Sequence, residues 1–144
     1  MIEFFSTIML PIKNKTYLIT GADGFIGQAV TNLLLKLNKL QVNCEIRRVV
    51  RQEGCFLEGT STFFVGDINS QTYWGEALEG VDTLIHLAGI KHHGKIKDLH
   101  LLRRMWDVNV DGVINLAKQA LKYKLKDSFF FQVLVSMVHL SLAI

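Results

Sequence analysis

Residues 17–30, with the sequence YLITGADGFIGQAV, decide the fold. An apolar run at 17–20 ends at Gly21, and a helical spacing of apolar residues follows, with Gly24 and Gly27 at its start. Glycine weakens both strands and helices by roughly 0.5–1 kcal/mol relative to alanine. Three glycines at one strand-to-helix junction therefore indicate that the backbone there lies close to another group.

The rest of the chain has the composition of one globular domain. It has 144 residues, of which 49% are hydrophobic and 20% are charged, and this excludes a disordered chain. The net charge of +3 is spread along the sequence without a dense basic run, so a nucleic-acid partner is not expected. Cys44 and Cys55 have no metal-ligand spacing and are typical of a reducing cytoplasm.

Both ends of the chain differ from the middle. Residues 1–14 carry Glu3 and Pro11 where a targeting segment needs positive charge and an unbroken apolar run, so we expect a poorly ordered leader. Residues 129–144 are apolar but short, and Gln132 and Ser136 interrupt them. This is not the pattern of a transmembrane helix, and no membrane partner is expected.

Strand-like and helix-like segments alternate along the chain. Strands are predicted at 17–20, 44–50, 61–67, 81–89 and 128–136. Helical spacing is carried by three sets of residues: Ile26, Ala29, Val30, Leu33, Leu34 and Leu37; Tyr73, Ala77 and Leu78 within 70–80; and Leu102, Met105, Trp106, Val113, Leu116, Ala117 and Ala120. The alternation predicts an α/β fold, the N-terminal part of a Rossmann-type doubly wound parallel sheet. Ligands of such sheets bind at the carboxyl ends of the strands.

The glycine pattern has a specific use in that context. The first glycine permits a tight turn, the second lets backbone N–H groups approach a pyrophosphate, and the third lets the helix pack on the strand. The alternative is a glycine-rich turn without a function. The strand before the motif and the helix after it favour dinucleotide binding.

Four motifs in the chain resemble one family. They are TGADGFIG at 20–27, GDI at 66–68, IHLAGIKHH at 85–93 and NVDG at 109–112. In this order they are similar to the extended short-chain dehydrogenase/reductases, the NAD-dependent sugar-nucleotide epimerases and dehydratases. Within that family the chain looks nearest to UDP-glucose 4-epimerase-like enzymes. The resemblance covers about residues 16 to 128 and marks 15–128 as the NAD(P)-binding domain.

The resemblance implies a cofactor site, a nucleotide-sugar as the substrate of full-length members, and a homodimer as one assembly open to the chain. Its cofactor-binding residues would be Gly21, Gly24, Phe25, Ile26, Gly27, Arg51, Asp67, Ile68, Leu87, Ala88, Gly89, Lys91 and Asn109. Asp67 would accept a hydrogen bond from the adenine amino group, the alternative being an aspartate that ends a strand. Asn109 would lie near the active site, the alternative being an amide bonded to neighbouring backbone.

The choice between NAD and NADP stays open. An acidic residue at the end of the second strand holds the ribose 2′-hydroxyl of NAD, whereas an arginine there accommodates the 2′-phosphate of NADP. The sequence RRVVRQEG at 47–54 offers both Arg51 and, two residues later, Glu53. The family favours NAD and the local residue favours NADP.

No catalytic residue can be assigned. The family uses a Tyr-x-x-x-Lys pair, but Tyr17, Tyr73 and Tyr123 are followed four residues later by Gly21, Ala77 and Asp127. We therefore expect an inactive, truncated chain, and a binding-only nucleotide module is the alternative. We expect residues 129–144 to be a divergent fifth strand and tail. Our hypothesis is that this tail is out of frame, because one permitted choice of codons for 132–144, read in another frame, restores a Ser-Ser-x-Tyr-Gly pattern similar to that of the family.

The five histidines do not predict a metal site. His86, His92, His93, His100 and His139 show no ligand spacing with cysteine or carboxylate residues. We expect His92 and His93 to be solvated loop residues.

Overall fold

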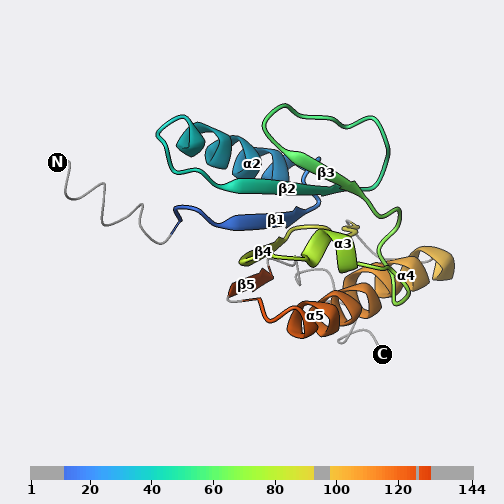
Figure 1. The fold of residues 1–144 in the computed structure, drawn as a ribbon. Coiled ribbons are helices and arrows are strands. Elements are labelled where there is room, and N and C mark those ends of the chain that lie inside the picture. Colours follow the sequence, from blue (N-terminus) through green and yellow to red (C-terminus); the bar gives the residue numbers. More distant parts are fainter. Residues whose placement is uncertain (1–11, 93–97, 126, 131–144) are drawn as a thin grey trace.

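A computed structural model describes residues 12–92, 98–125 and 127–130, and the chain there forms a five-stranded sheet (Figure 1). The strands are β1 (Thr16–Thr20), β2 (Glu45–Val50), β3 (Ser61–Phe64), β4 (Thr83–His86) and β5 (Asp127–Phe130). Their order is β3-β2-β1-β4-β5, and each neighbouring pair is parallel. The predicted α/β Rossmann-type fold is confirmed.

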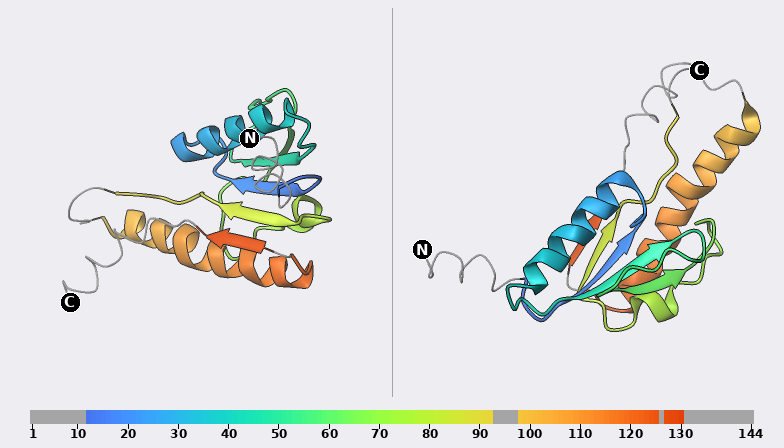
Figure 2. Two further views of the ribbon diagram at one scale, coloured as in Figure 1. Left: turned by 90° about the vertical axis from the view of Figure 1, so that its left-hand side faces the viewer. Right: turned by 90° about the horizontal axis from the view of Figure 1, so that it is seen from above.

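Helices cover both faces of this sheet (Figure 2). Helix α2 (Phe25–Asn38) lies on one face. The other face is covered by α3 (Gly75–Leu78) and by a long helix made of α4 (Leu99–Trp106), the π-helical segment η1 (Asp107–Gly112) and α5 (Val113–Lys122). None of the helices in the described part of the chain has the length and apolar character needed to span a bilayer.

Side chains of β1 alternate between two hydrophobic cores, because successive residues of a strand point to opposite faces. Leu18 packs with the long helix and α3, whereas Tyr17 and Ile19 pack with α2. The first core also contains Trp74, Leu78, Leu84, Val108 and Leu116, and the second contains Ala22, Leu34, Val42 and Ile46. The first core reaches the carboxyl edge of the sheet, where its residues Val49, Ile68 and Val108 also line a pocket.

The strands are shorter than the sequence pattern predicts. β3 ends at Phe64 rather than at residue 67, and Gly66 has a φ of 67°, which turns the chain away from the sheet. β4 covers Thr83–His86 rather than 81–89. For the fifth strand the structure describes Asp127–Phe130, and the predicted remainder at 131–136 lies outside the described residues. Residues 1–11 of the expected leader also lie outside, while Asn14 donates a backbone hydrogen bond to Val42.

Helix α2 buries part of the apolar stripe that the sequence predicts. Leu34 is buried, and Val30 and Leu37 pack against the same core, whereas Ile26 and Leu33 are exposed. A Cβ atom at Gly27 would collide with the carbonyl oxygen of Gly21, so the helix backbone lies directly on the turn there. Gly27, rather than Ile26, therefore faces the sheet at the start of the helix.

The helix predicted within 70–80 is reduced to the four residues of α3. Asn69 and Thr72 form a turn before it, in which the Asn69 amide donates to Thr72 Oγ1 at 2.9 Å and the Gln71 amide donates to Asn69 Oδ1 at 2.8 Å. Such local side-chain bonds compete with helix formation. Tyr73, predicted on the apolar face, is consequently exposed.

The long helix buries part of the face that the sequence predicts, since Met105 and Leu116 are buried on either side of the π-helical segment. Val108 and Asn109 of that segment are buried as well. Trp106, predicted among the buried residues, is exposed. It precedes the π-helical segment, so the wider turn does not account for this, and nothing in the structure explains it.

Candidate functional site

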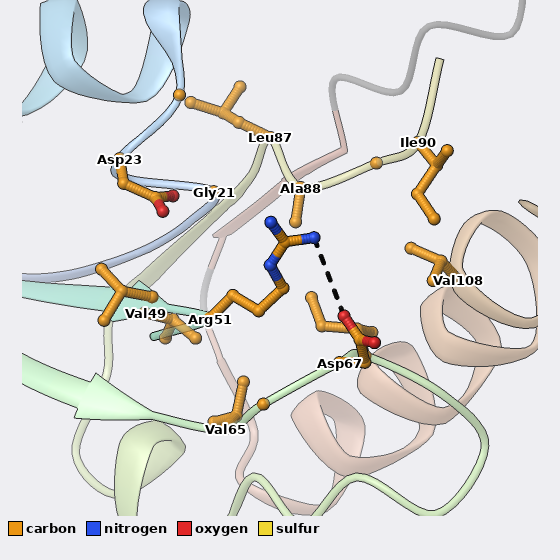
Figure 3. Close-up of a pocket in the computed structure, with 15 residues that line it drawn as sticks. Gly21, Asp23, Val49, Arg51, Val65, Asp67, Leu87, Ala88, Ile90 and Val108 are labelled. Atoms are coloured by element: carbon orange, nitrogen blue, oxygen red, sulfur yellow. Dashed lines mark ion pairs between the residues drawn. The ribbon is translucent and has the colours of Figure 1, made fainter. Parts of the chain in front are cut away.

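A pocket lies at the carboxyl ends of β1, β2, β3 and β4 (Figure 3). Each strand contributes the residues that directly follow or end it. The lining consists of Gly21, Asp23, Gly24, Val49, Val50, Arg51, Val65, Gly66, Asp67, Ile68, Leu87, Ala88, Gly89, Ile90 and Val108. This is the edge of the sheet at which open α/β folds bind their ligands.

The turn between β1 and α2, which we call the glycine end, is made by backbone. Gly21 has a φ of 64°, and a Cβ atom there would lie 2.8 Å from the amide nitrogen of Ala88. Gly27 is fixed by its contact with Gly21. Gly24 differs, because its Cβ atom would meet only the Gly21 carbonyl oxygen, at 3.2 Å, and its φ of −74° suits any residue. Packing inside the protein therefore demands glycine at 21 and 27 more strongly than at 24.

Helix α2 begins at this turn with its amide groups uncapped. Gly24 is the N-cap, no side chain caps the helix, and its first turn contains no acidic residue. The first N–H groups of a helix lack partners within the helix, and its dipole adds partial positive charge. An anion placed over Gly24 would accept hydrogen bonds from these N–H groups and be attracted by the partial positive charge.

A buried hydroxyl ties the glycine end to β4. Thr20 Oγ1 lies 2.6 Å from His86 Nδ1 and accepts from the amides of Leu87 at 3.2 Å and Ala88 at 3.3 Å. A hydroxyl that accepts two N–H groups uses its own hydrogen as a donor, which assigns Nδ1 as the acceptor. Burial lowers the pKa of His86 to about 4, so the ring is neutral at pH 7.

The opposite wall, which we call the arginine end, is made by side chains. Asp67 Oδ1 lies 3.9 Å from Arg51 Nη1, and Asp67 Oδ2 lies 3.3 Å from Arg104 Nη2 of α4. All three side chains are more than half exposed. Exposed ion pairs of this kind contribute about 0–1 kcal/mol to stability, so ligands can replace them readily.

Asn109 holds the loop that follows β4. Its Oδ1 accepts from the Ile90 amide at 2.9 Å and its Nδ2 donates to the Ile90 carbonyl at 2.8 Å. Gly89 lies beside it, since a Cβ atom there would be 3.3 Å from Asn109 Oδ1. These bonds agree with the alternative prediction for Asn109, an amide bonded to neighbouring backbone. Asn109 positions a wall of the pocket without lining it.

Two further contacts place the loop after β3. A Cβ atom at Gly112 would lie 2.6 Å from Ile68 Cγ2, so η1 approaches this loop closely. Asn115 Nδ2 donates to the Thr72 carbonyl at 2.8 Å, and Gln119 Nε2 donates to the same oxygen at 2.9 Å. The long helix thereby fixes the segment that carries Asp67 and Ile68.

The structure brings together eight of the thirteen residues assigned to the site: Gly21, Gly24, Arg51, Asp67, Ile68, Leu87, Ala88 and Gly89. Phe25, Ile26, Gly27, Lys91 and Asn109 do not line the pocket, and Phe25 is 93% exposed. Sequence reasoning missed Asp23, Val49, Val50, Val65, Gly66, Ile90 and Val108. Five of these seven are apolar, and at such positions a ligand wall and a core have the same composition.

The histidines of the described segments form no metal site. No group of three or more His, Cys, Asp or Glu side chains that could hold a metal ion is found in this part of the chain. His92, predicted to be solvated, is half-buried and its Nδ1 atom is buried without a hydrogen-bond partner. His93 lies outside the described residues.

The sequence of this chain is similar to those of known proteins. Residues 17–136 match the model of the NAD dependent epimerase/dehydratase family. A UDP-glucose 4-epimerase from Vibrio cholerae is 31% identical over 116 residues, which are 81% of this chain and 34% of that protein. A UDP-glucose 4-epimerase from Rickettsia typhi is 32% identical over 85 residues, which are 54% of this chain and 25% of that protein. The chain thus spans about a third or less of the length of these curated relatives.

Solved structures agree on the fold. A short chain dehydrogenase family protein from Francisella tularensis superposes with a TM-score of 0.62 at 27% identity, covering 77% of this chain and 46% of that one. A mutated uronate dehydrogenase superposes with the same TM-score at 21% identity, covering 81% and 38% of the two chains.

Proposed function

Because the chain belongs to the NAD-dependent epimerase/dehydratase family, we propose that its pocket binds a nicotinamide dinucleotide. The pyrophosphate would lie over Gly24 at the start of α2, and the adenosine would lie between Arg51 and Asp67. Leu87 and Ala88 would line the path toward the nicotinamide. When bound, the nicotinamide ring supplies the acceptor and donor of a hydride.

The observation that carries this proposal is the position of Gly24. Inside the protein its missing side chain relieves one contact at 3.2 Å, far less than at Gly21 or Gly27. It also lines the pocket and caps a helix that has no side-chain cap and no acidic residue in its first turn. A glycine that the fold needs so little, placed where an anion would be attracted, fits a site for phosphate groups.

The chain's residues divide the binding work. The amides at the start of α2 bind phosphate, Asp67 accepts from the adenine amino group, and Ile68 packs against the base. Phe25 and Ile26 contribute backbone amides, which accords with their side chains being exposed. Asn109 holds Ile90 and so orients the loop beside the ring. Lys91, exposed on that loop, would neutralise ligand charge.

We further propose a nucleotide-sugar as the substrate of the complete enzyme that contains such a domain. Two relatives bear the name UDP-glucose 4-epimerase, which supports an isomerase of nucleotide-sugar metabolism. The chain itself is proposed to bind without turnover, because none of its three tyrosines begins a Tyr-x-x-x-Lys sequence. A homodimer and a cytoplasmic location stay predictions.

Calorimetric titration of the 144-residue chain tests the proposal. NAD or NADP should bind, and Gly24→Val should abolish binding while helical content is retained, because the new side chain occupies the pyrophosphate position. Ala29→Val is the matched control: it adds a β-branched residue to the exposed side of α2, away from the pocket. Equal affinity in the wild-type and Gly24→Val chains would refute the site.

An activity assay tests the second part. Interconversion of UDP-glucose and UDP-galactose, followed with NAD added, should not rise above the background without protein. Proton transfer by a positioned acid or base supplies about 10²–10⁴-fold in rate. Epimerisation by this chain would show that other residues replace the missing pair.

A further inference from the structure

One carboxylate at the arginine end is shared between two arginines. Asp67 Oδ1 lies 3.9 Å from Arg51 Nη1, and Asp67 Oδ2 accepts from Arg104 Nη2 at 3.3 Å. The two cations come from separate elements, Arg51 from the end of β2 and Arg104 from α4. Two guanidinium groups facing one carboxylate leave an excess positive charge at this end of the pocket.

The two arginines differ in their relation to the pocket. Figure 3 shows the Arg51 side chain extending across the pocket from β2 toward Asp67. Arg104 does not line the pocket and reaches Asp67 from the side of the helix. An adenosine entering between Arg51 and Asp67 separates that pair but leaves the pair of Asp67 with Arg104 intact.

We propose that Arg104 is a positioning residue that selects 2′-phosphorylated adenosine dinucleotides by holding Asp67 while Arg51 turns to the ligand. The inference rests on the proposed function and deepens it. Arg51, once released, needs an anion, and a ribose 2′-phosphate provides one whereas a 2′-hydroxyl does not. Asp67 stays neutralised by Arg104 and therefore competes less for Arg51.

The neighbouring charged residues Asp23 and Arg103 do not take the places of Asp67 and Arg104. Asp23 is the second carboxylate of the lining, but it lies at the glycine end. Among the described residues, the ion pair of Arg51 is with Asp67. Arg103, next to Arg104, is engaged with Asp107 at 3.0 Å and does not contact Asp67. It offers a control that removes the same charge from the same helix.

The experiment measures the affinity of the chain for 5′-AMP, 2′,5′-ADP and 3′,5′-ADP by calorimetry. The readout is the ratio of the dissociation constants for 5′-AMP and 2′,5′-ADP, which differ only by the 2′-phosphate, so that contacts with the adenine and the 5′-phosphate cancel. We expect a wild-type preference for 2′,5′-ADP of about tenfold or more, since a charge-assisted contact is gained. The 3′-phosphate of 3′,5′-ADP should give a smaller gain.

The variants then show whether Arg104 acts by holding Asp67 or only through its positive charge. Arg51→Ala should bring the ratio close to one. Arg104→Gln should lower it by about threefold or more, Arg104→Lys should restore most of it, and Arg103→Gln should leave it nearly unchanged. In the Asp67→Asn background the further change Arg104→Gln should have no effect on the ratio, because the competitor for Arg51 is already gone.

Three results would overturn the inference. One is a wild-type ratio near one, and another is an equal preference for 3′,5′-ADP. The third is an effect of Arg104→Gln that persists in the Asp67→Asn background, which would reduce Arg104 to a distant charge. Binding of NAD with a ratio near one would leave the proposed function standing, whereas failure of NAD, NADP and all three adenosine nucleotides to bind would refute both. Thermal melting of each variant verifies that these exposed substitutions leave the fold intact.

Discussion

At the glycine end of the pocket the wall is backbone, whereas at the arginine end it is made by exposed side chains. The turn at Gly21 touches the backbone of the loop that follows β4 and that of α2, so ligand contact and folding depend on the same atoms. Arg51, Asp67 and Arg104 are more than half exposed and contribute little to folding. Under the proposed function the difference separates two tasks: one end would retain any dinucleotide, and the other could change its choice of dinucleotide without cost to the fold.

The sharpest test of this comparison is Gly27→Val. Its Cβ atom would collide with the Gly21 carbonyl oxygen, and neither backbone can yield without moving α2 off the sheet. We expect a loss of about 3 kcal/mol or more in the free energy of unfolding, measured by urea denaturation. Gly24→Ala should lose less than about 1 kcal/mol. Comparable stability of the two variants would remove the distinction between the glycines.

The pH dependence of the free energy of unfolding tests the role of His86, which contacts Thr20 at the glycine end. His86 has a pKa of about 4 in the fold against 6.5 unfolded, so between these values only the unfolded chain takes up the proton. The free energy of unfolding should therefore fall as the pH falls, by about 1.4 kcal/mol per unit and about 2 kcal/mol from pH 6.5 to 5. Denaturation of His86→Gln should show a flatter profile, and a flat wild-type profile would contradict the buried neutral ring.

Asn109→Ala tests whether the buried Asn109 side chain, like the glycine end, affects both stability and ligand affinity. The substitution leaves the Ile90 amide and carbonyl without partners, which should cost about 1–3 kcal/mol. Dinucleotide affinity should also fall, because Ile90 lines the pocket. Asn109→Asp keeps the acceptor for the Ile90 amide but turns a buried carboxylate oxygen toward the Ile90 carbonyl oxygen, so it should be no more stable than the alanine variant at pH 7. An affinity loss without a stability loss would instead place Asn109 in direct contact with the ligand.

The smallest effect is expected at the arginine end. Arg51→Ala should leave the unfolding midpoint unchanged and weaken NADP binding by about tenfold more than NAD binding, because NADP alone has the 2′-phosphate. Parallel titrations with the two cofactors measure this difference. An equal loss for both would mean that Arg51 contacts a group the two cofactors share.

Features that depend on residues close together in the sequence could be predicted, whereas features that depend on distant contacts could not. The turn at 20–27 is local: a strand, three glycines and a helix follow each other directly, and the structure has them in that order. The apolar stripe of α2 predicted the buried side of Leu34 but not the exposure of Ile26 and Leu33, because the close contact of Gly27 with Gly21 is not visible in the spacing of apolar residues.

The arginine end shows the opposite case. Arg51 and Asp67 could be assigned because each follows a strand, and strand ends converge at one edge of a parallel sheet. Arg104 gave no such signal, since it lies within a helix, and no local pattern indicates that its side chain reaches a loop after β3. The same holds for Trp106, whose exposure the spacing of apolar residues did not reveal.

The close approach of Gly112 to Ile68 has a consequence for how such sequences vary. A Cβ atom at 112 would lie 2.6 Å from a γ-methyl group that only a β-branched residue possesses at that place. Among homologues these positions are therefore expected to change as a pair, with alanine or serine at the first tolerated where the second becomes leucine. A combinatorial library that varies both positions together should recover folded members that two single-site libraries miss.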